Sequence, residues 1–283
     1  RALSITYIGS RDRFDAYSPV FSNVSKNRFF YNSLEAAISV DADIVFLHPE
    51  SANKSSYILL MLEQGKDVLC RYPLGYSLGE YAGIIEFQEK SGRIIGMLNP
   101  LIFYPSTGML KDIILQQEVS IREIHIHCNP ANLDPDFRVS GLTGTAQPLQ
   151  RMVSHFSGSY PRRLLASANH QGELAGIELS YDSFTCMIRF DPEQLGWNME
   201  IKGDDLFYRA DHTGMLSLNN EAEPRLAPDP GVFVDSMVEN LEDFMRAVRA
   251  REKPLVGSLD GLASIVLNKA AEESMKTGLA VDL

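Results

Sequence analysis

The chain has 283 residues, of which 45% are hydrophobic, and it carries a formal net charge of -11 at pH 7. This length and composition are typical of a globular protein with a large core and room for two domains. The acidic balance gives no support to nucleic-acid binding, which usually requires a basic face. No apolar run approaches the roughly 18 residues needed to cross a bilayer, so we expect no membrane span.

The three cysteines, Cys70, Cys128 and Cys186, lie in apolar, strand-like contexts. Their odd number and their surroundings argue against a disulfide framework. We therefore expect a reducing compartment and a cytoplasmic protein.

The first 100 residues alternate between strand and helix patterns, which is the sequence mark of a parallel sheet. Residues 51–64 read as a helix that Gly65 ends. Ser77 and Glu80 are spaced as a capping box at the start of another helix, which Gly92 ends.

Beyond residue 118 the apolar residues follow a period of two through a series of short strands, which predicts a largely antiparallel sheet. Residues 233–248 follow a helical period, and a last helix is expected from Ser258 to Lys276. We predict three parts: a Rossmann-like domain over 1–118, an antiparallel-sheet domain over 119–257, and a segment over 258–283 that returns to the first domain.

The segment Gly65-Lys66-Asp67-Val68-Leu69-Cys70-Arg71-Tyr72-Pro73-Leu74 resembles a signature of the glucose-fructose oxidoreductase, inositol dehydrogenase and MocA family (Gfo/Idh/MocA). In that family Ala-Gly-Lys ends a helix and Glu-Lys-Pro-Leu closes the next strand, with the lysine beside nicotinamide and substrate. Residues 43–49, 92–100 and 258–283 also resemble family segments in the same order. The resemblance implies an NAD- or NADP-dependent oxidoreductase acting on a sugar, polyol or similar polar compound.

The family opens with a strand and a Gly-x-Gly-x-x-Gly loop, and a second strand ending in Asp follows some 25 residues later, about as in dinucleotide-binding folds. Residues 3–12 resemble that second strand, which predicts that the first strand and the glycine loop are missing from this sequence. A sheet without its central strand would expose apolar edges. We therefore expect a native chain that begins further upstream, or a lost segment, in preference to a natural deletion of the strand.

Arg71 and Tyr72 stand where the family has Glu and Lys. A tyrosine here could donate a proton, although a phenol with a reference pKa of about 10 is a weak acid at neutral pH. Distantly related biliverdin reductases resemble this chain in having Tyr-Pro at this point. Tyr72 is thus a candidate catalytic residue, with a packing or substrate-contact role as the alternative.

The family's Asp-x-Gly-x-His motif corresponds to residues 141–150, which contain neither Asp nor His. Gln147 at this point can hydrogen-bond a substrate hydroxyl but cannot shuttle a proton. Asn99, at the end of the next family-like strand, is a second candidate substrate contact. His155, two helical turns on, is more simply read as a structural residue of the helix.

The resemblance also implies a set of cofactor contacts. Asp12 resembles the residue that holds the adenosine ribose, and Ser10 and Arg11 beside it would favour a 2'-phosphate. The remaining candidates follow two later strands: His48, Pro49, Glu50, Arg71 and Pro73. Without the glycine loop, we expect weak cofactor binding or none.

His125 and His127 share one face of a strand next to Cys128, a pattern that invites a metal interpretation. A structural zinc site normally needs four ligands, and no partner motif is evident, so we predict no metal site. Two functional hypotheses remain: a divergent reductase with altered proton transfer, and a noncatalytic relative that binds a ligand. We also expect a homo-oligomer formed through the antiparallel sheet, because Phe184, Met187, Ile188 and Phe190 suggest apolar residues on both faces.

Overall fold

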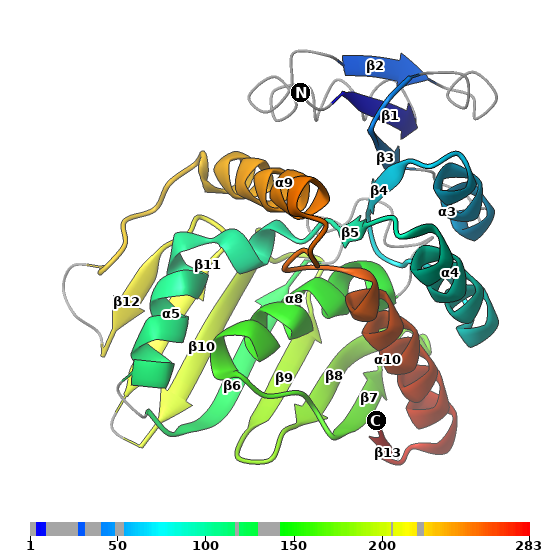
Figure 1. The fold of residues 1–283 in the computed structure, drawn as a ribbon. Helices are drawn as coiled ribbons and strands as arrows, with labels where there is room; N and C mark the ends of the chain where they lie inside the picture. Colours follow the sequence, from blue (N-terminus) through cyan, green and yellow to red (C-terminus); the bar gives the residue numbers. More distant parts are fainter. Residues whose placement is uncertain are drawn as a thin grey trace. The chain divides into compact units, whose positions relative to one another are not determined.

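A computed structural model describes residues 4–9, 28–31, 41–48, 54–116, 119–129, 142–204, 206–219 and 224–283 (Figure 1). The chain divides into two compact units, the first comprising residues 1–100 and 234–265 and the second residues 101–233 and 266–283. These limits differ from the predicted ones. The chain re-enters the first unit at residue 234, within one helix, and leaves it after residue 265, within another. Within the described ranges, no helix is long and apolar enough to cross a membrane.

The first unit contains a five-stranded sheet in the order β2-β1-β3-β4-β5, and every strand pair in it is parallel. The strands are β1 (Ile5–Gly9), β2 (Arg28–Tyr31), β3 (Ile44–His48), β4 (Asp67–Cys70) and β5 (Ile95–Met97). The residues of β4 and β5 are all buried, as in parallel sheets covered on both faces. The predicted Rossmann-like sheet is confirmed.

The prediction for the first strand was wrong. β1 pairs with β2 on one side and with β3 on the other, so that Ile5 lies opposite both Arg28 and Ile44. No gap separates β1 from β3, and β1 therefore takes the position that the prediction had left to a missing strand. The error arose because the segment between β1 and β3 is long enough to form a further strand, β2, on the other side of β1. The four residues of β2 show no clear period, so the sequence did not reveal this strand.

Two helices of the first unit follow the predicted stop and start signals. α3 (Lys54–Glu63) is followed by Gly65 in the left-handed conformation, with φ +70°. α4 (Leu78–Ser91) begins after Ser77, whose hydroxyl accepts from the Glu80 N–H at 3.2 Å. Only this half of the capping box forms, because the Glu80 carboxylate accepts instead from the Tyr76 N–H at 2.8 Å.

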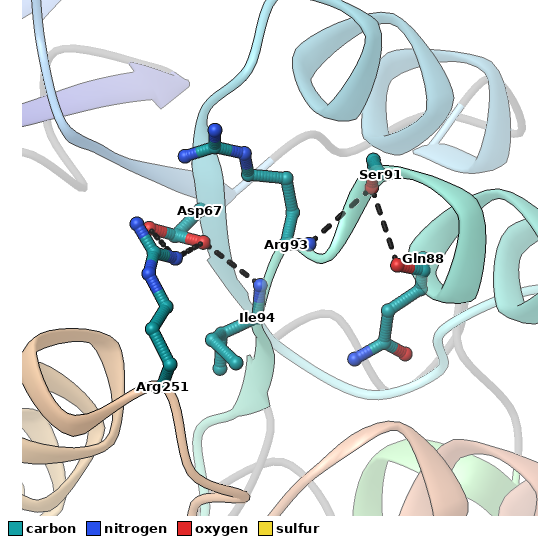
Figure 2. Close-up of polar contacts among 6 residues, drawn as sticks. All are labelled: Asp67, Gln88, Ser91, Arg93, Ile94 and Arg251. Atoms are coloured by element: carbon teal, nitrogen blue, oxygen red, sulfur yellow. Dashed lines mark hydrogen bonds and ion pairs between the residues drawn. The ribbon is translucent and has the colours of Figure 1, made fainter.

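A third helix, α9 (Val232–Ala250), supplies the core of the first unit from a distant part of the chain. Its apolar side packs with residues of β1, β3 and β4; the cluster contains Ile5, Tyr7, Ile44, Phe46, Leu69, Leu98, Met237, Leu241, Phe244, Met245 and Val248. Just after the helix, Arg251 donates to both carboxylate oxygens of Asp67 at 2.9 and 3.0 Å, and Asp67 also accepts from the Ile94 N–H at 2.8 Å (Figure 2). The end of α9 is thereby fastened to the start of β4.

The second unit contains an eight-stranded sheet in the order β12-β11-β10-β6-β9-β8-β7-β13. Its strands are β6 (Ile121–Cys128), β7 (Arg163–Ala168), β8 (Leu174–Ser180), β9 (Thr185–Phe190), β10 (Trp197–Gly203), β11 (Phe207–Asp211), β12 (Leu216–Leu218) and β13 (Val281–Asp282). All pairs are antiparallel except β6 with β9. This confirms the predicted largely antiparallel sheet.

Helices cover one face of this sheet (Figure 1). A short 3₁₀ turn (Pro100–Phe103) leads to α5 (Pro105–Gln116), and α8 (Leu142–Ser157) follows β6. α10 (Ser258–Thr277) adds residues from its second half, including Leu267, Ala270 and Ala271, to the same core.

The premise that both faces of the second sheet are apolar was wrong. Phe184 and Ile188 are buried in the core, and Phe190 packs against it. The alternating positions of the central strands carry charged side chains instead, with the Arg209 guanidinium 3.3 Å from the Glu200 carboxylate and the Lys202 ammonium 3.7 Å from that of Glu123. Of the four apolar residues behind the prediction, only Met187 lies at an alternate position, where it pairs with His125 and Glu178 of the neighbouring strands.

Candidate functional site

The strand order of the first unit indicates which edge of its sheet is the candidate ligand-binding edge. β2 and β3 lie on opposite sides of β1, so the strand order reverses at β1. In doubly wound sheets, ligands bind at the carboxyl ends of the strands beside such a reversal. The residues that follow β1, β3, β4 and β5 are therefore the candidates for ligand contact, and they include most of the predicted site residues.

Several predicted cofactor residues lie outside the described part of the chain. Ser10, Arg11 and Asp12, as well as Pro49 and Glu50, are among them. The backbone of His48 pairs with that of Gly9 in the sheet.

The structure also changes the premise on which three of these residues were chosen. Ser10, Arg11 and Asp12 directly follow the strand at the reversal, which is where a Gly-x-Gly-x-x-Gly loop begins, rather than the second strand. Counted from Gly9, the second and third glycine positions of that pattern are Arg11 and Phe14. The end of the second strand, which carries the ribose-binding carboxylate in dinucleotide folds, corresponds here to the end of β2.

Tyr72 lies two residues beyond the end of β4. Its side chain is 5% exposed, and the Tyr72–Pro73 peptide bond is cis. The neighbouring strand fixes the exit from β4, because the Leu98 N–H donates to the Cys70 carbonyl at 2.8 Å. Arg71 is half-buried and Pro73 is buried, so the predicted loop is packed into the first unit rather than projecting from it.

The start of α3 is attached to this loop and to α4 by two contacts that the sequence did not indicate. The Lys54 ammonium donates to the carbonyls of Arg71 and Tyr72 at 3.3 and 3.4 Å. The Ser55 hydroxyl donates to the Glu80 carboxylate at 2.8 Å. A lysine and a serine at a helix start read as solvent-facing residues, and only a tertiary contact distinguishes them.

Asn99 is fully buried two residues after β5. Its N–H donates to the Asn240 side-chain oxygen at 2.7 Å, so α9 determines where this strand end lies. Asn240 was missed in the sequence although it lies on the apolar side of the helix, three residues after Met237 and four before Phe244, because a polar residue there gives no local sign of its partner. Nearby in β4, burial raises the pKa of the Cys70 thiol to about 12, which leaves it protonated and inert as a nucleophile.

Gln147 belongs to α8 in the second unit, where it is 1% exposed. On the same helix the Gln150 amide donates to the Ser154 hydroxyl at 2.7 Å. His155 is half-buried, and burial together with the charges of Lys111 and Arg151 lowers its pKa to about 4. A neutral His155 at physiological pH agrees with the structural role expected for it.

The histidine pair on β6 has ordinary surroundings. The His125 ring nitrogen lies 3.2 Å from the Glu123 carboxylate on the same strand. Among the residues that the structure describes, no group of three potential metal ligands comes together.

Comparisons with known proteins agree with this architecture. No protein-family model matches the chain. D-xylose 1-dehydrogenase (NADP(+)) 2 from Haloferax volcanii is similar at 22% identity over 276 residues, covering 89% of this chain and 84% of that protein. The crystal structure of myo-inositol 2-dehydrogenase from Lactobacillus plantarum matches with a TM-score of 0.81 at 16% identity over the full length of both chains.

The chain has the two-domain fold of the Gfo/Idh/MocA oxidoreductases. An oxidoreductase from Agrobacterium radiobacter, solved in complex with NAD+, L-tartaric acid and magnesium, matches with a TM-score of 0.72 at 13% identity. That match covers 100% of this chain and 98% of the Agrobacterium chain. The resemblance inferred from residues 65–74 thus extends to the whole fold.

Proposed function

We propose that this protein is a divergent NAD(P)-dependent oxidoreductase that acts on a sugar, polyol or similar polar compound. The observation that carries the proposal is the strand order, which reverses at β1 and brings the ends of β3, β4 and β5 to the edge where doubly wound sheets bind dinucleotides. The relatives described above support the chemistry, since they include an NADP-dependent sugar dehydrogenase and an inositol dehydrogenase. A nicotinamide cofactor bound at this edge would supply a hydride.

The residues of this chain would bind and orient the substrate and move one proton. Tyr72 is the proposed proton donor to a carbonyl oxygen, and solvent would restore its proton afterwards. Asn99 and Gln147 are proposed substrate contacts, because an amide donates and accepts hydrogen bonds but does not transfer protons at neutral pH. The proposed cofactor contacts are Ser10, Arg11, Asp12, His48, Pro49, Glu50, Arg71 and Pro73.

A noncatalytic, ligand-binding protein is the second candidate. It is favoured by the absence of two proton carriers: Tyr72 stands where the family has its lysine, and residues 141–150, which include Gln147, lack the family's histidine. General acid and base groups contribute about 10²- to 10⁴-fold each to a rate. A protein without both would retain binding more readily than turnover.

The affinity for NADH and NADPH tests how well this chain binds a dinucleotide. Arg11 and Phe14 stand where glycines would let the main chain approach a pyrophosphate, so we expect NADH and NADPH to bind only weakly. Calorimetric or fluorescence titration of both cofactors measures this. Dissociation constants in the low micromolar range would contradict the expectation and would show that another loop holds the phosphates.

Tyr72→Phe tests the proton-donor role, because it removes the hydroxyl and keeps most of the packing. If a reductase activity is found with a panel of sugar and polyol carbonyl compounds, we expect the variant to lose about 10²-fold in kcat. Tyr72→Lys serves as the matched comparison and should not raise activity, since Gln147 still cannot relay a proton. If turnover is unchanged in Tyr72→Phe, this side chain lines the binding site and does not donate the proton.

We further propose that the protein forms a homo-oligomer through the open face of the second sheet and resides in the cytoplasm. Complementary charges on that face, including Arg209 and Glu200, allow association by polar contacts. The three cysteines are free and buried, which suits a reducing compartment. Light scattering at micromolar concentration measures the first point, and a stable monomer would contradict it.

A further inference from the structure

A buried ammonium group lies at the start of α3. Lys54 is the first residue of this helix, and it is 5% exposed although lysine is rarely buried without partners. Its Nζ atom donates to the carbonyls of Arg71 and Tyr72 at 3.3 and 3.4 Å. Hydrogen bonds from a charged donor are stronger than neutral ones and offset part of the cost of removing the charge from water.

The two acceptors give this contact its significance. Both are main-chain oxygens of the residues that directly follow β4, and one belongs to Tyr72 itself. The ammonium therefore fixes the backbone at the point where it leaves the sheet, and the backbone direction determines where the Tyr72 side chain points.

The neighbouring residue of α3 holds the other end of the same loop. The Ser55 hydroxyl donates to the Glu80 carboxylate at 2.8 Å, and the same carboxylate oxygen accepts from the Tyr76 N–H at 2.8 Å. Ser55 is buried as well. The first turn of α3 thus holds the loop over residues 71–77 at its beginning and near its end.

We propose that Lys54 is a positioning residue that sets the orientation of Tyr72 at the carboxyl edge of the sheet. Its catalytic consequence rests on the proposed oxidoreductase function, whereas the positioning itself does not. A lysine that served only global stability would act equally on all parts of the first unit. Removal of a positioning lysine changes the surroundings of Tyr72 more than those of the other residues of the unit.

The test is ¹⁹F NMR of protein labelled with 3-fluorotyrosine. The Tyr72 signal is identified as the one absent from Tyr72→Phe. Lys54→Met keeps an unbranched, apolar stem in the same space and removes the ammonium, and we expect it to shift or split the Tyr72 signal more than those of the other tyrosines. Lys54→Arg keeps a charged donor and should leave a single signal near the wild-type position.

Lys66→Met is the matched control. Lys66 is also 5% exposed, and burial lowers its pKa, but it precedes β4 at the opposite end of the strand. This variant removes a buried ammonium from the same unit and should leave the Tyr72 signal in place. A folded Lys54→Met protein with an unmoved Tyr72 signal would overturn the proposal, as would an equal shift in Lys66→Met. If Lys54→Met does not fold, Lys54→Gln is judged by the same signal and the same criteria.

Kinetics add a second readout if a reductase activity is found. Misplacing a reacting group by about 1 Å can cost as much as 10²-fold in rate, so we expect Lys54→Met to lower kcat by about 10- to 100-fold with a smaller change in KM. In the Tyr72→Phe background, Lys54→Met should add little further loss. A full additional loss there would show that Lys54 does not act through Tyr72. A shifted ¹⁹F signal in a protein without reductase activity would uphold the positioning and refute the proposed function.

Discussion

Arg251→Ala removes the guanidinium that donates to both oxygens of a buried carboxylate. The Asp67 side chain is 2% exposed, and its two oxygens receive the Arg251 guanidinium at 2.9 and 3.0 Å and the Ile94 N–H at 2.8 Å (Figure 2). The variant leaves that carboxylate in place with the Ile94 N–H but without the Arg251 charge. The cost is therefore dominated by a desolvated anion and not by the lost attraction alone.

The magnitude follows from the burial of the two groups. Breaking a fully buried ion pair by removing one partner costs about 3–5 kcal/mol. Arg251 is 50% exposed, so water already screens part of the attraction and can replace some of it. We expect a loss of about 2–3 kcal/mol in the free energy of unfolding of the first unit.

Arg162→Ala is the control, because it removes an arginine from an arginine–carboxylate pair that is exposed and not buried. Arg162 also contacts both oxygens of a carboxylate, through two nitrogens that each lie 3.1 Å from Asp182 where Arg251 uses one, but both side chains are largely exposed. Surface pairs of this kind contribute little, so the control should unfold close to wild type.

Urea unfolding followed by circular dichroism measures both variants. The single tryptophan, Trp197, lies in the core of the second unit, and its fluorescence reports on that unit separately. Arg251→Ala should shift the circular dichroism transition more than the fluorescence transition. The reasoning fails if Arg251→Ala is no more destabilising than Arg162→Ala.

The other predictions concern packing and pH. Gly96→Ala would place a Cβ atom 2.4 Å from the Phe244 ring, so we expect a loss of about 1–3 kcal/mol in thermal or urea unfolding. Gly108→Ala, in α5 with open space around the new atom, should instead gain up to about 1 kcal/mol, and a loss there would contradict the packing argument. His155 has a folded-state pKa of about 4, below its ordinary value of about 6.5, so the unfolded chain binds the proton more tightly and stability falls as pH drops from about 6.5 to about 4. In His155→Gln the unfolding midpoint should depend less on pH over this range. If its pH dependence is unchanged, other titrating groups are responsible for it.

The sequence by itself determined the kinds of structure and several of their limits. Gly65 and Gly92 end helices because each adopts the left-handed conformation at low cost, and Ser77 caps a helix through its own hydroxyl. The period-two pattern beyond residue 118 predicted the second sheet, because strand faces alternate residue by residue. Residues 65–74 carried the likeness to the Gfo/Idh/MocA fold and placed Tyr72 after a strand end.

Only the tertiary structure decided which strands are neighbours and what surrounds the candidate site. The position of β1 beside β3 depends on a crossover through β2, and strand order is a long-range property that spacing along the chain does not specify. The same holds for Lys54, which reads as a solvated residue until α3 packs its ammonium against the carbonyls of Arg71 and Tyr72. Such contacts join residues 17 and 18 positions apart through the fold, so no local pattern in the sequence announces them.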